Sequence, residues 1–299
     1  MGQMECPCVC PYKGRFLKDG FCCMMVDINL PVYGGHMKME QREKVDIATL
    51  SLPGELHEWI HGAPLYESSG CSGARTLYID REDGAYLKIA NRGALLRASK
   101  MQTFFSNIRM SPPVLLYLPG EKDYMITRAL KGEDGTSEKY LARPERLSEI
   151  FGHSLRLLHE VDTRDCPVRD RMDALLASAR STPFLQDHLN DIKDYIGTAE
   201  AEKAAAEIAA GGGILKNDVL IHGDYCLPNI ILNNWAFEGF IDVADGGIGD
   251  RHYDLAWGLW TLNWNLKTPK YGQRFLDAYG WDIIDKDRLR ICGLLAAME

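Results

Sequence analysis

An aspartate, an asparagine and a second aspartate follow short apolar runs late in the chain, at a spacing that suits phosphoryl transfer. Asp224 comes after the apolar run 219–221, Asn229 follows five residues later, and Asp242 ends the apolar run 239–241. Phosphoryl transfer needs in-line positioning and cations that neutralise a triphosphate. A carboxylate accepts the proton of the acceptor hydroxyl, and carboxylate and amide oxygens suit Mg²⁺. Asp224 is therefore a candidate base, and Asn229 and Asp242 are candidate metal ligands.

The sequence around these residues indicates whether they form a catalytic motif or match one by chance. An aspartate and an asparagine five residues apart would mean nothing alone, because such short motifs match by chance. Here apolar strand-like runs at 219–221 and 230–232 flank the pair, and Asp242 follows at the distance of a hairpin. The order also resembles the protein-kinase set, in which a catalytic-loop aspartate precedes an asparagine and a metal-binding aspartate. Coincidence is the weaker interpretation.

Three segments of the last third make the resemblance more specific. Residues 222–229, 239–242 and 249–256 are similar to motifs of the aminoglycoside 3'-phosphotransferase family, and the LPNI sequence at 227–230 is typical of it. The resemblance extends from about residue 52 to the C-terminus. It implies an α+β, bilobal protein-kinase-like fold, with a small β-rich N-lobe and a larger helical C-lobe carrying a catalytic hairpin. It further implies Mg²⁺, ATP as donor with GTP as an open alternative, and an aminoglycoside hydroxyl as acceptor.

The resemblance also assigns residues to the nucleotide. Lys88, in the β-rich run 85–89, matches the strand lysine that binds the α- and β-phosphates. Ser72, with Gly70 and Gly73, matches the loop that covers the phosphates, where small residues let backbone N–H groups approach an anion. The loop does not follow the Gly-x-Gly-x-x-Gly pattern. A solvated edge lysine would be the preferred interpretation of Lys88 without the other motifs.

The resemblance gives supporting roles to two further residues. His222 is expected to brace the catalytic loop, and Asp254, in the run DRHYDLA at 250–256, is expected to anchor it. Both are interpreted as structural. By position, Asp224 is again the base, and Asn229 and Asp242 are again the metal ligands.

The chain departs from the family pattern on the nucleotide side. A helix after Lys88 should carry a glutamate that pairs with this lysine, but that place falls near Ala98, and no acidic residue occurs between Lys88 and Glu121. We therefore expect impaired turnover unless another group orients Lys88. Asp245 stands where the family often has arginine, which predicts the loss of one cationic contact.

The acceptor side is less well defined. The family places acidic side chains and the terminal carboxylate against a cationic drug. The candidates at matching places are Asp187, Asp191, Asp194 and Glu299. For each of the three aspartates, a solvated helix face is the competing interpretation.

Hydrophobic periodicity predicts the elements that position these residues. Strands are expected at 76–79, 85–89, 114–118, 124–126, 219–221, 230–232 and 239–241. Helices are expected at 94–107, 144–161, 199–210 and 253–265. We interpret residues 1–44 as a disordered appendage, 45–128 as a nucleotide-binding N-lobe, and 129–299 as a catalytic and substrate-binding C-lobe.

Composition narrows the classes of protein. The 299 residues are 46% hydrophobic and 25% charged, as in ordinary globular proteins. The net charge of -8 weighs against a nucleic-acid-binding surface and suits a cationic ligand. No apolar run reaches the length of a membrane span, and no signal peptide is recognisable. We expect a cytoplasmic protein that binds neither membranes nor nucleic acids, and leave its oligomeric state open.

Several alternatives stay open. A His-Glu-x-x-His match on a helix would bind zinc in a metallohydrolase; its residues are His57, Glu58 and His61. A cysteine cluster near the start could also bind zinc, although its spacing is not that of a zinc ribbon; it comprises Cys6, Cys8, Cys10, Cys22 and Cys23. Within the kinase fold, the acceptor could be another amino-alcohol or a sugar, or the protein could bind nucleotide with impaired turnover.

Overall fold

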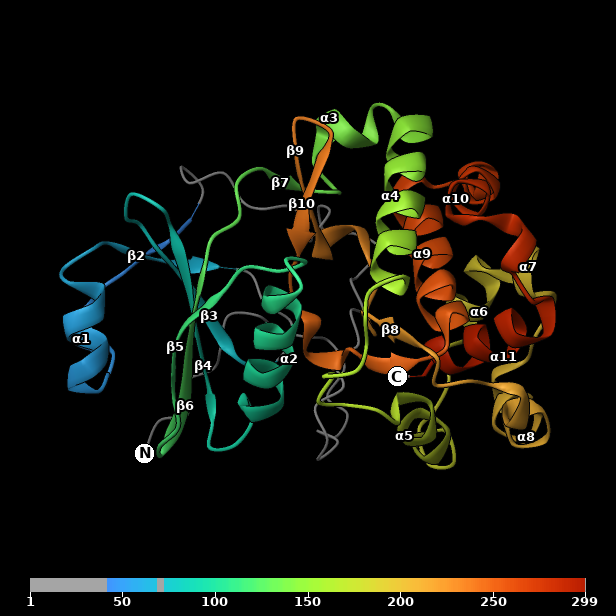
Figure 1. Ribbon diagram of the computed structural model, residues 1–299, viewed down its shortest axis with the longest axis horizontal. Coiled ribbons are helices and arrows are strands. Elements are labelled where there is room, and N and C mark those ends of the chain that lie inside the picture. The colour runs from blue at the N-terminus through green and yellow to red at the C-terminus, as the bar shows by residue number, and fades with distance from the viewer. Residues whose placement is uncertain (1–41, 69–72, 299) are drawn as a thin grey trace.

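The smaller of two lobes contains a six-stranded antiparallel sheet (Figure 1), and the computed structural model describes residues 42–68 and 73–298. The spatial order is β1-β2-β3-β4-β6-β5. The strands are β1 (Lys44–Val45), β2 (Leu65–Ser68), β3 (Arg75–Ile79), β4 (Ala85–Asn91), β5 (Val114–Leu118) and β6 (Lys122–Arg128). Helix α1 (Gly54–Ile60) lies at the outer side of this sheet, and α2 (Leu96–Asn107) lies between the sheet and the larger lobe.

Side-chain alternation along β4 places Lys88 on the face of the sheet that α2 covers. Leu87 and Ile89 point into the core of the small lobe on the other face. Successive side chains of a strand point to opposite faces, so Lys88 shares its face with Ala90. Ala90 packs in one cluster with Ala98 of α2. The register of the sheet therefore directs Lys88 toward the larger lobe.

The larger lobe is mainly helical. Its helices are α3 (Glu138–Leu141), α4 (Pro144–His159), α5 (Arg171–Ser178), α6 (Gln186–Asp191), α7 (Lys193–Ile196), α8 (Ala201–Gly211), α9 (Arg251–Leu266), α10 (Gly272–Tyr279) and α11 (Lys286–Ala296). Four apolar residues of α4 are fully buried, namely Leu147, Phe151, Leu155 and Leu158, and Ile150 of the same helix is partly buried. In Figure 1, α4, α9 and α10 lie side by side, and α4 and α9 both contact β8 (Val219–Ile221). This helical core supports the strand that precedes Asp224.

Two small sheets complete the larger lobe. One has the order β10-β9-β7, and its strands are β7 (Glu133–Asp134), β9 (Ile230–Asn233) and β10 (Ala236–Phe240). The other pairs β8 with β11 (Gly247–Gly249). The sequence analysis expected no strand where β7 lies, because two residues are too few for a periodic signal. Gly132 has φ +115°, and a Cβ there would lie 2.3 Å from the carbonyl oxygen of Leu232, so glycine permits this close pairing.

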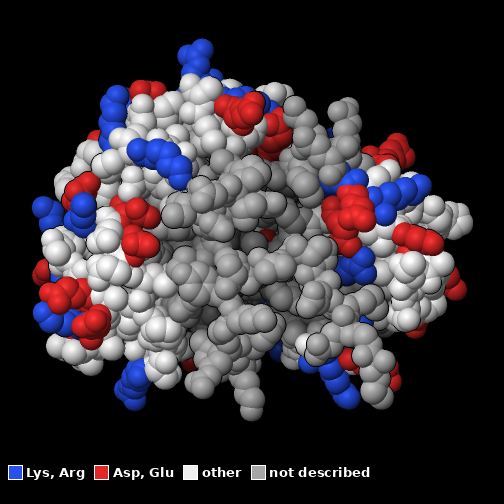
Figure 2. All heavy atoms as spheres, turned by 180° about the vertical axis from the view of Figure 1, so that it is seen from behind, with Lys and Arg blue, Asp and Glu red and all other residues white. Residues whose placement is uncertain are grey.

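The two-lobed α+β architecture predicted from the sequence is confirmed, and the predicted strands and helices are found within a few residues of their expected bounds. Across residues 42–68 and 73–298, no helix is long and apolar enough to cross a bilayer. On the face shown in Figure 2, acidic and basic side chains of the described residues are interspersed. The predicted appendage and its five cysteines lie outside the described residues, apart from the last few positions, where β1 begins at Lys44.

Candidate active site

The loop after β8 brings Asp224 and Asn229 together. The amide Nδ2 of Asn229 donates hydrogen bonds to Asp224 Oδ2 and to the backbone oxygen of Asp224, both at 2.9 Å. Residues Leu227–Asn229 form a short 3-10 helix that turns the chain back toward Asp224. Pro228 suits the first turn of such a helix because its missing N–H would have no partner there. The five-residue spacing seen in the sequence therefore corresponds to a closed polar loop.

Asp254, in the first turn of α9, holds the start of this loop. Its carboxylate accepts hydrogen bonds from the backbone N–H of His222 at 2.6 Å and of Gly223 at 2.9 Å. The buried ring of His159 contacts the same carboxylate at 3.2 Å, and burial lowers the pKa of His159. Asp254 is fully buried. A buried carboxylate with several donors is well compensated, and these contacts suit the anchoring role expected for Asp254.

His222 connects the catalytic loop to the segment that carries Asp242. Its Nε2 lies 3.0 Å from the carbonyl oxygen of Ile241, and the backbone N–H of Asp224 points at its Nδ1 at 3.3 Å. The carbonyl can only accept, so Nε2 carries the proton and Nδ1 is the acceptor. The ring thus bridges the two chains through one donor and one acceptor, as expected of a bracing residue.

The β9–β10 hairpin sets Asn229 beside Asp242. Phe240 pairs with Ile230, and the backbone N–H of Ile241 donates to the carbonyl oxygen of Asn229 at 3.0 Å. Asp242 comes next, with a left-handed backbone at φ 55°. The side-chain nitrogen of Asn229 is bonded to Asp224, so its amide oxygen is the atom left for a cation. This oxygen and the Asp242 carboxylate suit Mg²⁺ in type.

Lys88 reaches across from the small lobe to Asp242. The Lys88 ammonium forms an ion pair with Asp242 Oδ1. Asp242 is therefore a group that can orient Lys88 in the absence of a helix glutamate, which is the exception that the sequence hypothesis allowed. Ala98 supplies no partner, as the sequence indicated, but the position and length of the lysine side chain let it contact the metal-ligand candidate instead. The structure thus gathers Lys88, Asp224, Asn229 and Asp242 in one place between the lobes.

Asp245 does not stand alone in the position where the family often has arginine. Arg171 of α5 is buried, and it donates to the backbone oxygen of Asp245 at 2.8 Å and to its Oδ1 at 3.4 Å. This contact could not be expected from the sequence, because the two residues lie 74 positions apart in the chain. The carboxylate at 245 is thus compensated by a cation from another helix.

The electrostatics around Asp224 favour its use as a base. Burial raises the pKa of Asp224 above its ordinary value of 3.8, while His222 opposes this shift. A base must be deprotonated to accept a proton, so turnover is lost as the pH falls through the raised pKa. We expect the acid limb of the kcat/KM profile to lie above pH 3.8, and a profile measured over about pH 4–9 checks this. A flat profile over that range would contradict it.

The predicted phosphate-covering loop is only partly described. Ser72 and Gly70 lie outside the described residues. Gly73 is exposed and has φ +64°, a left-handed conformation that suits glycine. The flanking strands β2 and β3 pair up to Ser68 and Thr76, and Thr76 lies opposite Lys88 on β4. The loop therefore begins at the Lys88 end of the sheet.

The His-Glu-x-x-His motif does not have the helical geometry that the zinc metallohydrolase alternative requires. His57 and Glu58 lie on the exposed face of α1, but His61 is the C-terminal capping residue, with φ 50° outside the helix. The two imidazoles therefore do not follow each other on one helical face. Over the part of the chain that the structure describes, no three His, Cys, Asp or Glu side chains are grouped to hold a metal ion. The geometry gives the metallohydrolase alternative no support.

The acidic acceptor candidates separate into two groups. Asp191 is half-buried at the end of α6, where burial raises its pKa; Trp260 of α9 donates to it and lowers the pKa. Asp187 lies on α6 too and raises the pKa of Asp191 through its charge. Asp194 is exposed on α7. Glu299 lies outside the described residues, although Met298 pairs with Phe184 just before α6.

Trp260 is a further candidate for the acceptor side, and the sequence reasoning missed it. It lies next to Thr261, whose Oγ1 accepts from the N–H of Leu227 in the catalytic loop at 3.2 Å. The same face of α9 carries Trp257 and Trp264, whose rings lie 5.5 and 5.9 Å from that of Trp260. The recurrence of tryptophan every three or four residues was a readable signal, because that spacing marks one helical face.

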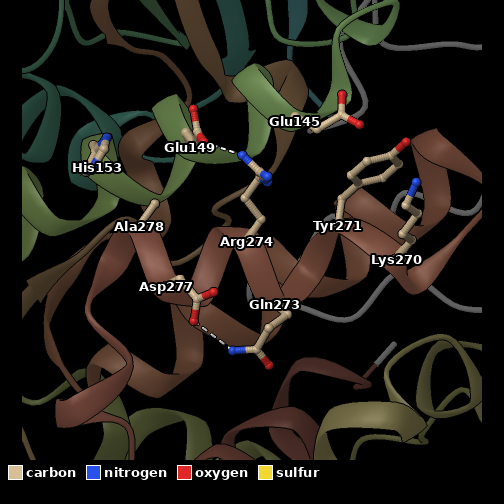
Figure 3. Close-up of a pocket in the computed structure, with 9 residues that line it drawn as sticks. All are labelled: Glu145, Glu149, His153, Lys270, Tyr271, Gln273, Arg274, Asp277 and Ala278. Atoms are coloured by element: carbon tan, nitrogen blue, oxygen red, sulfur yellow. Dashed lines mark hydrogen bonds and ion pairs between the residues drawn. The ribbon is translucent and has the colours of Figure 1, made fainter.

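A surface groove of about 730 Å³ lies elsewhere, between α4 and α10 (Figure 3). Glu149 forms an ion pair with Arg274, and Gln273 donates to Asp277 at 2.8 Å. Glu149 and Arg274 thus compensate each other's charge, and no residue of the catalytic loop lines the groove. The candidate catalytic residues lie at the junction of the lobes instead.

The two lobes and the site between them define a kinase-type phosphotransferase. Residues 68–292 match the model of the family described as "Phosphotransferase enzyme family". The chain is 39% identical, over 85% of its length and 98% of the relative, to a probable aminoglycoside 3'-phosphotransferase of Lactococcus lactis. It is 28% identical to the aminoglycoside 3'-phosphotransferase of Niallia circulans, over 81% of this chain and 95% of that one. The chain belongs to this family, on its aminoglycoside phosphotransferase branch.

Solved structures show the same fold. An aminoglycoside-3'-phosphotransferase of type VIII superposes with a TM-score of 0.61 at 22% identity, over 76% of this chain and 90% of that one. An aminoglycoside phosphotransferase from Streptomyces rimosus, in complex with ADP and streptomycin, gives 0.57 at 20% identity, over 84% and 97%. The protein-kinase-like fold expected from the sequence is thereby confirmed.

Proposed function

We propose that this protein transfers the γ-phosphate of ATP to a hydroxyl of an aminoglycoside antibiotic, and so confers resistance in the cytoplasm. The observation that carries the proposal is the meeting of Asp224, Asn229, Asp242 and Lys88 between the lobes. Support for the acceptor comes from the relatives named aminoglycoside 3'-phosphotransferase. The names of those relatives favour the 3'-hydroxyl as the position of transfer.

In the proposed reaction, Asp224 accepts the proton of the acceptor hydroxyl. The hydroxyl oxygen bonds to the γ-phosphorus as the bond to the β,γ-bridging oxygen breaks, and ADP leaves. Lys88 would bind the α- and β-phosphates, and Asn229 and Asp242 would hold Mg²⁺, which neutralises phosphate charge. Asn229 fixes the Asp224 carboxylate through its amide nitrogen, so the base is already oriented.

The acceptor is expected to lie against α6 and α9. A protonated amino-sugar offers cations for carboxylates and a ring face for tryptophan. Asp191 and Trp260 offer both groups together, and Trp260 is adjacent to the residue that contacts the catalytic loop. Asp187 and Glu299 are further candidates. Asp194 is the least favoured of the four, since the structure leaves it exposed on α7.

Replacing Asp191 by asparagine tests this acceptor face. The change keeps the shape of the side chain and removes the charge that would pair with an ammonium. We expect the KM for kanamycin to rise about tenfold, the effect of one hydrogen bond to a charged group, with kcat nearly unchanged. Steady-state kinetics measure it, with Asp194→Asn as the matched control. Equal KM values for the two variants would place the acceptor elsewhere.

A coupled assay of ADP release tests the function as a whole. Kanamycin, neomycin and unrelated amino-alcohols are compared as acceptors with MgATP and with MgGTP. Rapid ADP release with an aminoglycoside supports the proposal. Release only with another amino-alcohol or a sugar would show that the acceptor belongs to that class and is not an aminoglycoside.

Nucleotide binding without efficient turnover is the second candidate, because α2 carries no glutamate for Lys88. Ligands that bind only the native state raise Tm. A rise in Tm with MgATP but no ADP release with any acceptor would favour this candidate over the transferase.

A further inference from the structure

Arg97 of α2 contacts the segment that follows Asp242. Its Nε donates to the carbonyl oxygen of Ala244 at 2.9 Å, and a terminal nitrogen donates to the carbonyl oxygen of Gly246 at 3.2 Å. These two carbonyls belong to the turn 242–246, which contains the short 3-10 helix Val243–Asp245. A guanidinium holds several donors in one rigid plane, so one side chain fixes two points of this turn.

A second arginine holds the same turn from the large lobe. Arg171 donates to the carbonyl oxygen of Asp245 at 2.8 Å. Three successive carbonyl oxygens, those of Ala244, Asp245 and Gly246, are therefore bonded by arginines from opposite lobes. Partial burial and the charge of Arg171 lower the pKa of Arg97, and Asp245 opposes them. The Asp245 carboxylate forms an ion pair with Arg171 and also acts on Arg97 through its charge.

The position of the turn 242–246 affects both Asp242, the metal-ligand candidate, and Asp224, the candidate base. Asp242 begins it. The turn also lies against Gly223. A Cβ added to Gly223 would lie only 2.1 Å from the backbone oxygen of Asp245. A shift of the turn would therefore move a metal-ligand candidate and press on the residue before Asp224. The hydrogen bonds of Arg97 go to backbone carbonyl oxygens of this turn, so its effect on Asp242 and Asp224 is indirect.

We propose that Arg97 is a positioning residue that fixes the metal-binding turn 242–246 from the small lobe. It would give α2 a tether to the catalytic centre in place of the acidic residue that the helix lacks. The inference rests on the proposed phosphoryl transfer and adds a residue to it. In protein kinases the corresponding helix carries a glutamate that pairs with the strand lysine. Here the helix carries Arg97, which bonds to the backbone of the turn 242–246.

Metal affinity measures this role without requiring turnover. In Arg97→Ala, we expect Mn²⁺ to bind the enzyme–ADP complex about tenfold more weakly, as when outer contacts of a metal site are removed. Electron paramagnetic resonance of free Mn²⁺ reports this affinity. The Mg²⁺ concentration for half-maximal turnover should rise by the same factor, and the KM for kanamycin should stay unchanged.

Two further variants separate positioning from charge and from folding. Lys100→Ala removes another exposed cation from the same helix and should leave Mn²⁺ binding at the parental value. Arg97→Lys keeps the charge but not the rigid fork, and should recover part of the affinity. Parental Mn²⁺ affinity in a folded Arg97→Ala protein would overturn the proposal. If the parent binds Mn²⁺ and ADP but never releases ADP from ATP, the transferase function fails while the Arg97 result remains interpretable.

Discussion

Asp224→Asn is expected to lower kcat about 100- to 10,000-fold, the contribution typical of a general base. Asparagine has nearly the same shape, and its amide oxygen can still accept the bond from Asn229. It cannot accept the proton of the acceptor hydroxyl. Binding of nucleotide and drug should persist, because the substitution leaves Lys88 and Asp242 in place. Single-turnover kinetics with saturating MgATP and kanamycin measure the loss.

The same substitution should stabilise the folded protein. Burial raises the pKa of Asp224, so its ionised form disfavours the native state wherever the pH lies above that raised pKa. The gain in Tm from Asp224→Asn should therefore be present near neutral pH and shrink as the pH falls toward the ordinary carboxyl value. Asp165→Asn, at an exposed position, is the matched control. Near-parental kcat in Asp224→Asn would remove this residue from the mechanism.

Gly223→Ala is expected to be the most damaging change of a single methyl group. Gly223 has φ +84°, and a Cβ would lie 2.1 Å from the backbone oxygen of Asp245. Backbone atoms cannot rotate away, so the catalytic loop and the metal turn must separate. A misplacement of about 1 Å near the reacting groups costs on the order of 100-fold in rate. We expect at least that loss in kcat, together with a lower Tm.

Gly62→Ala is a matched control for Gly223→Ala. It introduces the strain of an alanine in a left-handed conformation without a steric clash of the new Cβ with a neighbouring atom. Gly62 has a similar φ of +75°, yet a Cβ there would meet no atom within 4 Å. Its substitution should cost only the left-handed strain, about 1 kcal/mol, and leave kcat unchanged. Similar stability and activity in the two variants would show that the catalytic loop and metal turn are not in tight contact.

The catalytic loop could be predicted from the sequence because its geometry is local. Asp224 and Asn229 are five residues apart, and a hairpin brings Asp242 beside them, so periodicity and turn signals were sufficient. Lys88 was also placed on the correct strand. The structure places Leu87 and Ile89 in the core on one face and Lys88 on the other, an alternation that the sequence analysis did not use.

Contacts between distant segments could not be predicted in the same way. Lys88 pairs with Asp242, 154 residues away, and Arg97 bonds to Ala244, 147 residues away. Nothing near Arg97 in the sequence distinguishes it from an exposed helical arginine. The short strand β7 could not be predicted for another reason. Its two residues form a strand because they pair with β9, and not because of their own strand propensity.

The central claim is that this site moves a phosphoryl group onto an aminoglycoside hydroxyl. The most direct measurement is the mass of the drug after incubation with enzyme and MgATP, using kanamycin B and its 3'-deoxy analogue side by side. We predict that kanamycin B gains one phosphoryl group and that the 3'-deoxy compound gains none. Phosphorylation of the analogue would place the transfer at another hydroxyl. An unchanged mass for both compounds, and for neomycin, would contradict the account.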